Sequence, residues 1–329
     1  MEKLDFLAVG DITTDAFIRI KDAHVTCTVD RSACELCVRF GDKIPYESVT
    51  VVPAVGNAPN AAVAAARLGL SAGLVTDLGD DDVGRKSLDV LKEEGVSLDF
   101  VRTHPDIPSN YHYVLWYEEE RTILVKHNAY PYAFPGIEPP AWLYLSSLGE
   151  SSLPYHGEIA AYLAAHPETK LAFQPGTFQM KLGKEKLRDI YARTDVFFCN
   201  KEEAQNILGT SEKDERELLE MLADLGAKMV FLTNGPRGAY AFDGESAWMT
   251  PMYPDPKPPV NRTGAGDAFA STVTAMLARG KSVPEALSYG PVNSMSVVQK
   301  IGAQKGLLSL STIEKLLSDK PAEYEVTEL

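Results

Sequence analysis

The pattern of hydrophobic and polar residues predicts short buried strands that alternate with helices over most of the chain. Apolar runs that end at glycine or aspartate are typical of strands, and apolar residues at helical spacing predict the helices between them. The expected strands are residues 6–10, 74–77, 143–145, 171–173, 196–199 and 229–233, and the expected helices are 60–67, 82–94, 155–165, 202–208 and 214–225. This order predicts an α/β fold, with a mostly parallel sheet covered by helices on both faces.

Two regions interrupt the alternation with a β-rich pattern. Residues 17–53 show no helical period, and they contain strand-like pieces at 23–29, 34–40 and 48–52. Residues 110–117 and 122–127 have the pattern of a hairpin around a charged turn, Glu118 to Arg121. We expect both regions to join in one small sheet that acts as a lid. The expected division is a lid of residues 17–53 and 109–127 over a core of residues 1–16, 54–108 and 128–329.

Composition restricts the class of partner. The chain has 329 residues, 45% of them hydrophobic, and 32 basic against 46 acidic side chains give a formal net charge of −14. Such a surface repels nucleic acids and anionic membranes, so we expect a small-molecule partner. No apolar run approaches the roughly 20 residues that span a bilayer, and the first residues lack a signal-peptide pattern, so we expect a cytoplasmic protein. The 4 cysteines do not suggest a disulfide framework.

Residues 261–269, Asn-Arg-Thr-Gly-Ala-Gly-Asp-Ala-Phe, carry the clearest chemistry. The turn Gly264-Ala265-Gly266 leads into a helix whose first N–H groups and macrodipole attract anions such as phosphate. Asp267 stands in the first turn of that helix, where it can accept a proton from a substrate hydroxyl while the N–H groups stabilise a transferring phosphoryl group. Taken alone, the segment also fits an ordinary helix start with glycines for close packing.

This segment resembles the signature D-T-x-G-A-G-D-x-F of the PfkB/ribokinase family of ATP-dependent small-molecule kinases. The resemblance implies a ribokinase-like three-layer α/β/α sandwich with a β lid, and the use of ATP and Mg²⁺. It also implies that Asp267 is the catalytic base and that Gly264, Ala265 and Gly266 form the anion hole. Other segments in the family order extend the resemblance over nearly the whole chain.

Two N-terminal segments carry the substrate side of the resemblance. Residues 10–15, Gly-Asp-Ile-Thr-Thr-Asp, are similar to the family's first strand and turn, which implies that Thr13 and Asp15 contact substrate hydroxyls. A carboxylate accepts polyol hydrogen bonds well, although an Asx turn is the alternative interpretation of Asp15.

The second segment, residues 56–69, is similar to the family's G-G-x-x-x-N signature before an alanine-rich helix. Gly56, Asn57 and Asn60 are the expected substrate residues, and Asn60 either caps the helix or reaches the ligand. Val55 stands where the family usually has its first glycine. This departure weakens any transfer of the substrate from sugar-specific members.

Two later segments resemble the nucleotide side of the family's site. Asn200 and Glu203 match an N-x-x-E element linked to Mg²⁺, which would act here through water, and a capping box is the alternative interpretation. Residues 233–238, Thr-Asn-Gly-Pro-Arg-Gly, look like the family's T-x-G-x-x-G loop, although such a loop is also a common turn. The expected nucleotide-binding residues are Asn200, Thr233, Gly235, Arg237, Gly238 and Gly302.

The largest departure from the family pattern is Asn261-Arg262, where the family usually has Asp-Thr. In many members that aspartate helps to bind a monovalent cation, together with carbonyls near the loop that is Gly302-Ala303-Gln304 here. Asparagine is a poorer cation ligand, and arginine is itself a cation. We hypothesise that Arg262 partly replaces K⁺, so that K⁺ dependence is weak. The alternative is that Arg262 points to solvent and carbonyls still bind the ion.

Three other kinds of site were considered from the sequence, namely a P-loop, a zinc site and a dinucleotide-binding motif. Residues 79–87 nearly match a P-loop, but the lysine is displaced and three aspartates would repel a triphosphate. His24, Cys27, Cys34 and Cys37 have spacings that could hold Zn²⁺, although strand-packing cysteines fit the strand pattern better. The first strand is not followed by G-x-G-x-x-G, which argues against a dehydrogenase.

The function that these residues favour is an ATP-dependent kinase of a small sugar, of the ribokinase or fructokinase type. A nucleoside kinase of the same fold is the alternative, because lid aromatics could cover a sugar or a base: Phe40, Tyr46, Tyr111, Tyr113 and Trp116. A catalytically silent sugar or nucleotide sensor is the non-enzyme alternative, and the intact Asp267 argues against it. The lid's edge strands favour pairing between subunits, so we expect a homodimer formed through the lid.

Overall fold

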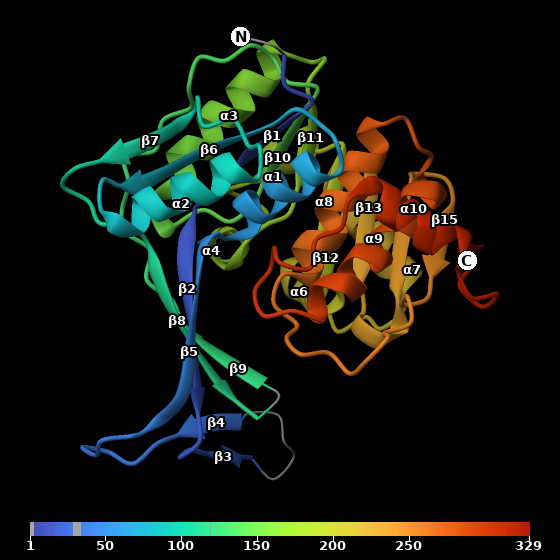
Figure 1. The fold of residues 1–329 in the computed structure, drawn as a ribbon. Coiled ribbons are helices and arrows are strands. Elements are labelled where there is room, and N and C mark those ends of the chain that lie inside the picture. The colour runs from blue at the N-terminus through green and yellow to red at the C-terminus, as the bar shows by residue number, and fades with distance from the viewer. Residues whose placement is uncertain (1–2, 29–33, 119) are drawn as a thin grey trace.

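The computed structural model describes residues 3–28, 34–118 and 120–329, and its middle layer is a large twisted sheet (Figure 1). The strand order, within the described residues, is β16-β15-β14-β13-β12-β11-β10-β1-β6-β7. These strands are β1 (Phe6–Val9), β6 (Ala72–Gly79), β7 (Val101–His104), β10 (Trp142–Leu145), β11 (Lys170–Phe173), β12 (Val196–Asn200), β13 (Met229–Thr233), β14 (Ala239–Phe242), β15 (Ala247–Thr250) and β16 (Thr327–Glu328). Neighbours from β7 to β13 pair in parallel, and β14, β15 and β16 add an antiparallel edge. Every strand expected in the core is present.

Helices cover both faces of this sheet, as the alternating pattern predicts. Phe6 and Ala8 of β1 pack into one core, whereas Leu7 and Val9 pack into the other, because neighbouring side chains in a strand point to opposite faces. The first core includes α1 (Asn57–Arg67), α2 (Asp82–Glu93), α8 (Ala265–Ala278), α9 (Val283–Val298) and α10 (Leu310–Ser318). The second includes α3 (Leu153–Ala165), α5 (Arg188–Arg193), α6 (Lys201–Leu208) and α7 (Glu215–Ala223), and short turns of helix are η1 (Glu150–Ser152), α4 (Thr177–Leu182) and η2 (Gly235–Arg237). The three-layer sandwich is therefore confirmed.

The sequence pattern predicted that the lid is one sheet, but the lid consists of two sheets. Its main sheet has the order β5-β2-β8-β9, formed by β5 (Tyr46–Val55), β2 (Thr13–Ile20), β8 (Tyr111–Tyr117) and β9 (Glu120–Leu124). A separate hairpin of β3 (His24–Cys27) and β4 (Cys34–Cys37) stands at its far end (Figure 1). Val29 of the expected strand 23–29 and Glu119 of the expected turn lie outside the described residues. The strand β2 starts at Thr13 and β5 ends at Val55, so both reach into segments that the sequence pattern assigned to the core.

The cysteines of the β3–β4 hairpin are neither zinc ligands nor simple packing residues. The antiparallel register places Cys27 opposite Cys34, with the two Cα atoms 4.1 Å apart, and the two residues form a disulfide. Cys37 lies opposite His24 and keeps a free thiol. Two of the four proposed ligands are thus used in a bond between strands. No cluster of three or more potential metal ligands occurs in the described part of the chain.

In the acidic turn that resembles a P-loop, the carboxylate of Asp81 accepts the backbone hydrogen bonds. Asp81 caps α2 by accepting a hydrogen bond from the Gly84 N–H at 2.8 Å, and it also accepts one from the Ser109 N–H at 2.9 Å. This turn therefore ties the start of a lid segment to the core. Separately, none of the helices within the described ranges is both long and apolar enough to cross a membrane.

Candidate active site

The carboxylate of Asp267 is held by three side-chain amides from distant parts of the chain. Asn57 Nδ2 donates to Oδ1 at 2.8 Å, Asn60 Nδ2 donates to Oδ2 at 2.7 Å, and Gln174 Nε2 donates to Oδ1 at 3.2 Å. Asn57 and Asn60 come from the first turn of α1, Gln174 follows β11, and Asp267 lies in the first turn of α8. The fold therefore brings the expected base and two expected substrate residues into one hydrogen-bonded cluster.

The helix α1 begins at Asn57, three residues before the expected start. Gly56, with φ +125°, takes the N-cap position, and Pro59 fits the first turn because that turn needs no internal N–H donor there. The prediction that Asn60 might cap the helix is therefore wrong. Its side chain lies inside the first turn and donates to Asp267.

Burial raises the pKa of the Asp267 carboxyl above its usual range, and the amide donors on Asn60, Gln174 and Asn57 oppose this rise. Because the pKa in the folded state is raised, the contribution of this group to the free energy of unfolding is full below the ordinary aspartate pKa. This contribution is lost as pH rises from that value through the raised pKa. Above its raised pKa, Asp267 is a poorly solvated carboxylate that accepts protons more readily than an exposed one. This is the property that a general base for a hydroxyl needs.

The turn before Asp267 allows only glycine at its first position. Gly264 is the N-cap of α8 with φ +82°, and a Cβ there would lie 2.3 Å from the Cβ of Ala303. The close contact with Ala303 places the loop at 302–304 against the start of α8. The first N–H groups of α8 are left free to bind an anion beside Asp267.

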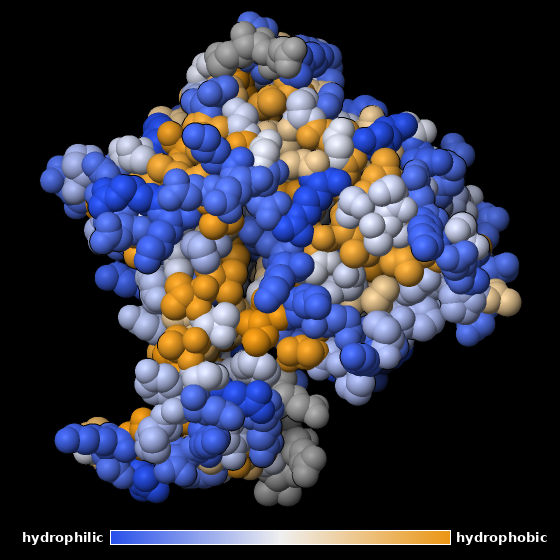
Figure 2. Space-filling model, viewed as in Figure 1, coloured by the Kyte–Doolittle hydropathy of each residue, from blue (hydrophilic) through white to orange (hydrophobic). Residues whose placement is uncertain are grey.

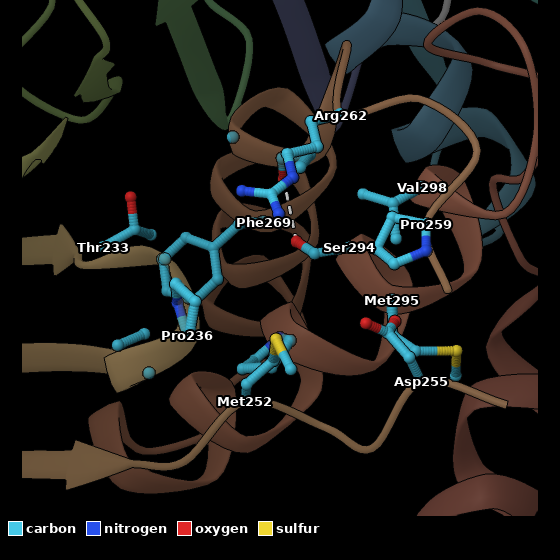
Figure 3. Close-up of a pocket in the computed structure, with 16 residues that line it drawn as sticks. Thr233, Pro236, Met252, Asp255, Pro259, Arg262, Phe269, Ser294, Met295 and Val298 are labelled. Atoms are coloured by element: carbon cyan, nitrogen blue, oxygen red, sulfur yellow. Dashed lines mark hydrogen bonds between the residues drawn. The ribbon is translucent and has the colours of Figure 1, made fainter. Parts of the chain in front are cut away.

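A cavity of about 290 Å³ adjoins this helix start, and it is lined by residues of the expected nucleotide loop and of α8 and α9 (Figure 3). Thr233, Gly235 and Gly238 line it, as do Ala265 and Gly266. Asn200, Arg237 and Gly302, which were also expected to bind nucleotide, are not among its lining residues. Arg237 instead donates to Asn234 Oδ1 at 3.3 Å.

Several residues of this cavity escaped the sequence analysis because they form no local motif. They are Met252, Asp255, Pro259, Pro291, Ser294, Met295 and Val298. Most are apolar, as is common for the lining of a small-molecule pocket. Ser294 donates to the Ala265 carbonyl at 2.8 Å, which ties α9 to the start of α8 (Figure 3).

Asn200 and Glu203 form a complete capping box at the start of α6. The Asn200 N–H donates to Glu203 Oε2 and the Glu203 N–H donates to Asn200 Oδ1, both at 2.8 Å. Burial raises the pKa of Glu203, and the negative charges of Asp267 and Glu202 raise it further. Glu203 and Asp267 are therefore close enough for the charge of one to act on the other.

The substrate-side residues at the start of the lid are buried and have unused polar atoms. Asp15 is 7% exposed and His112 is 9% exposed, and they lie opposite each other on β2 and β8 with Asp15 Oδ1 and His112 Nδ1 3.5 Å apart. Asp15 Oδ1 and His112 Nε2 have no hydrogen-bond partner in the described residues. Thr13 is buried beside them, and its hydroxyl donates to the Thr14 carbonyl at 3.4 Å. His112 was not expected, because a single histidine in a strand gives no sequence signal.

Asn261 and Arg262 precede the turn that starts α8. The Asn261 side chain is buried and accepts a hydrogen bond from the Thr263 N–H at 2.7 Å, so it fixes the turn. Arg262 lines the cavity (Figure 3), where its charge lowers the pKa of Asp255 while burial raises that pKa.

Comparisons with known proteins agree with this arrangement. A family model described as pfkB family carbohydrate kinase matches residues 26–309. Ribokinase from Bacillus subtilis (strain 168) is 28% identical over 304 residues, which cover 89% of this chain and 99% of that protein. Its amino-acid sequence therefore matches this chain almost from end to end.

Two solved structures have the same fold. The nucleoside kinase of Methanocaldococcus jannaschii, described as an archaeal member of the ribokinase family, superposes with a TM-score of 0.80 at 17% identity, over 97% of this chain and 100% of that chain. Arabidopsis thaliana ribokinase complexed with ribose and ATP superposes with a TM-score of 0.80 at 21% identity, over 96% of this chain and 99% of that chain. At these identities the two structures show the fold alone, and they confirm it.

Replacing Gly264 by alanine should damage the start of α8. The left-handed φ and the clash with Ala303 together should lower the free energy of unfolding by about 2 kcal/mol or more. Gly266→Ala is the matched control, because a Cβ at Gly266 has its nearest neighbour at 3.8 Å and alanine favours a helix. Urea unfolding of both variants measures the difference, and equal stabilities would contradict this account of the turn.

Proposed function

This chain belongs to the pfkB family of carbohydrate kinases, and we propose that it transfers the γ-phosphoryl group of ATP to a hydroxyl of a small sugar, with Asp267 as general base. It is a phosphotransferase that acts on an alcohol group. The observation that carries the proposal is the position of the Asp267 carboxylate, which lies in the first turn of α8, beside a cavity that the same turn lines. A base and an anion-binding helix end are thus adjacent.

In the proposed mechanism, Asn57 and Asn60 hold the Asp267 carboxylate in place while the acceptor hydroxyl donates its proton to it. Asp15, Thr13 and the backbone at Gly56 bind the other hydroxyls of the sugar. A Cβ at Gly56 would lie 2.6 Å from the Asp11 carbonyl, so only glycine permits this close approach. The N–H groups of Gly264, Ala265 and Gly266 stabilise the charge on the transferring phosphoryl group.

ATP is proposed to occupy the cavity lined by Thr233, Gly235 and Gly238, and Asn200, Arg237 and Gly302 are proposed as further nucleotide-side residues. Asn200 and Glu203 are proposed to hold Mg²⁺ through water, because Glu203 lies where Asp267 adds negative charge. When bound, Mg²⁺ would neutralise charge that develops on the phosphates. The segments 17–53 and 109–127 are proposed to act as the lid that excludes water, over a core of 1–16, 54–108 and 128–329.

A sugar fits this site better than a nucleoside. The β2–β8 register places Tyr111 opposite Thr14 and Tyr113 opposite Ala16, so both tyrosines point away from the face that carries Asp15. Their rings lie 5.2 Å apart on that outer face, and Tyr113 is half exposed. Tyr111 and Tyr113 therefore do not offer a stacking surface for a nucleobase, and Trp116, which shares the face of Asp15, is already stacked against the Arg19 guanidinium, 4.8 Å from its ring centroid. A silent sensor is disfavoured because the base and the helix end beside it are both intact.

Asp267→Asn should fold normally and lose activity. General base catalysis contributes about 10²–10⁴-fold, so kcat should fall by roughly that factor. In the wild type, kcat should decrease as pH falls through the raised pKa of Asp267, because only the ionised carboxylate accepts the proton. Asp255→Asn, on the nucleotide side, is the control and should change KM for ATP more than kcat. Turnover of Asp267→Asn near the wild-type rate would refute the assignment of the base.

Monovalent cations should have little effect on the rate. Arg262 lines the cavity beside Gly266, and we propose that its charge partly replaces K⁺. The measurement is the initial rate in buffer free of Na⁺ and K⁺, before and after K⁺ is added. The double variant Asn261→Asp/Arg262→Thr restores the usual family pair and should gain stimulation by K⁺. A manyfold stimulation of the wild type by K⁺ would be incompatible with the proposal.

We also propose a homodimer formed through the outer face of the lid. Val49, Val51, Tyr113 and Leu124 share this face by strand register and are 49%, 51%, 49% and 51% exposed. Hydrophobic side chains gather over the lid strands near the sandwich in Figure 2, and a face of this kind is commonly buried by a second copy.

The double variant Val51→Glu/Leu124→Glu should be monomeric, because charges would be buried at the interface, and light scattering after gel filtration measures this. Leu329→Glu, at a residue 45% exposed outside the lid, is the control and should leave the mass unchanged. A wild-type protein that stays monomeric at micromolar concentration would rule out the lid dimer.

A further inference from the structure

Two arginines near the active site have no hydrogen-bond or ion-pair partner among the described residues. They are Arg121 on β9 and Arg262 before α8. Every other described arginine makes at least one such contact. Arg262 is exposed, so water can solvate its charge, whereas Arg121 is partly buried, and in a protein with a net charge of −14 its missing partner needs a physical reason.

Strand register places Arg121 on the face of the lid that carries Asp15 and His112. Arg121 lies opposite Trp116, and Trp116 lies opposite Arg19, which is four residues beyond Asp15 and therefore on the same face. Val52, opposite Asp15 on β5, lies against Gly302, and its Cγ1 would be 3.2 Å from a Cβ added there. This face is therefore turned toward the loop that packs on the catalytic turn.

The charges that act on Arg121 agree with its position on the face of Asp15. Burial lowers the pKa of the Arg121 guanidinium, the negative charges of Glu120 and Asp15 raise it, and the positive charge of Arg262 lowers it. Arg121 is thus close enough to Asp15 and to Arg262 to interact with both. It forms no ion pair within 4 Å with the carboxylate of Asp15 or with that of Glu120. A partly buried guanidinium without a partner loses hydration and gains no hydrogen bond in return.

The two arginines have different positions relative to ATP. Arg262 lines the nucleotide cavity together with Ala265 and Gly266, so phosphates bound at the helix start would match its charge (Figure 3). Arg121 lies on the substrate face, which also carries two buried polar atoms without a hydrogen-bond partner among the described residues, Asp15 Oδ1 and His112 Nε2. The face that is expected to bind the sugar therefore offers both a carboxylate oxygen that can accept a hydrogen bond from a sugar hydroxyl and a positive charge without an ion-pair partner.

We propose that the acceptor of this kinase is an anionic sugar, a sugar phosphate or a sugar acid, whose anionic group binds the guanidinium of Arg121 while Asp15 binds a hydroxyl. The proposal rests on the kinase function proposed above. Phosphate and carboxylate each offer two oxygens that can accept the two parallel N–H donors of a guanidinium, so both belong to one class of ligand. Arg121 is the residue that would distinguish these acceptors from neutral sugars.

The test compares matched acceptors that differ in charge: D-fructose with D-fructose 6-phosphate, and D-glucose with D-gluconate. ATP consumption gives kcat and KM for each, and calorimetry without ATP measures binding of the same compounds. The variants are Arg121→Gln, Arg121→Lys and the control Arg19→Gln. Arg19 is on the same face of the lid, but it stacks on Trp116 and pairs with Glu47.

The wild type should prefer an anionic acceptor to its neutral partner. Loss of a charge-assisted hydrogen bond typically costs about 10- to 100-fold in binding, so Arg121→Gln should weaken the anionic acceptor by about that factor and leave the neutral one unchanged. Arg121→Lys should recover part of the loss, and Arg19→Gln should resemble the wild type. The phosphate and carboxylate pairs identify which anion is preferred.

Three results would overturn the proposal. One is a wild type with no preference for either anionic acceptor in turnover or in binding. Another is a fall in kcat that is equal for neutral and anionic acceptors in Arg121→Gln, which would assign Arg121 to the phosphoryl group of ATP. The third is anion binding that does not depend on Arg121. If no compound is phosphorylated but D-fructose 6-phosphate still binds through Arg121, the kinase function fails and the anion site stands.

Discussion

The hydrogen bonds between three amides and the Asp267 carboxylate are the constraint on which this site depends. A partly buried carboxylate needs donors, and here Asn57, Asn60 and Gln174 supply them from the start of α1 and the end of β11. The amides are oriented in turn, since Gln304 donates to Asn60 Oδ1 at 3.0 Å and Tyr144 donates to Gln174 Oε1. One carboxylate thus fixes the relative positions of elements from both halves of the sandwich.

The same network reaches the lid. Gln304 also donates to the Ala54 carbonyl at 2.6 Å, close to the end of β5, and its neighbour Ala303 packs on Gly264. The loop at 302–304 therefore contacts the catalytic turn, the helix that orients the base and a strand of the lid. A movement of the lid would displace the turn at Gly264, which is proposed to bind the phosphoryl group, because these contacts are closely packed.

Much of this arrangement could be predicted from local patterns. Buried strands, their order and the helix after Gly264 follow from periodicity and turn residues, and the resemblance to a kinase signature pointed to Asp267. The cavity residues on α9, such as Ser294 and Met295, could not be found in this way, because they look like ordinary core residues until α9 packs on α8. The disulfide of Cys27 and Cys34 also depends on a strand register that spacing alone leaves open.

The sequence by itself determined the sandwich and the position of Asp267, the proposed base, in the first turn of a helix, since both depend on short-range patterns of burial and helix termination. Only the tertiary structure decided what surrounds that base, because Asn57, Gln174 and Asp267 are far apart in the chain and meet through packing. It also decided which face of the lid each side chain occupies. A shift of one residue in strand register would turn Arg121 and His112 away from the site, and hydrophobic pattern in the mostly exposed β9 is too weak to set that register.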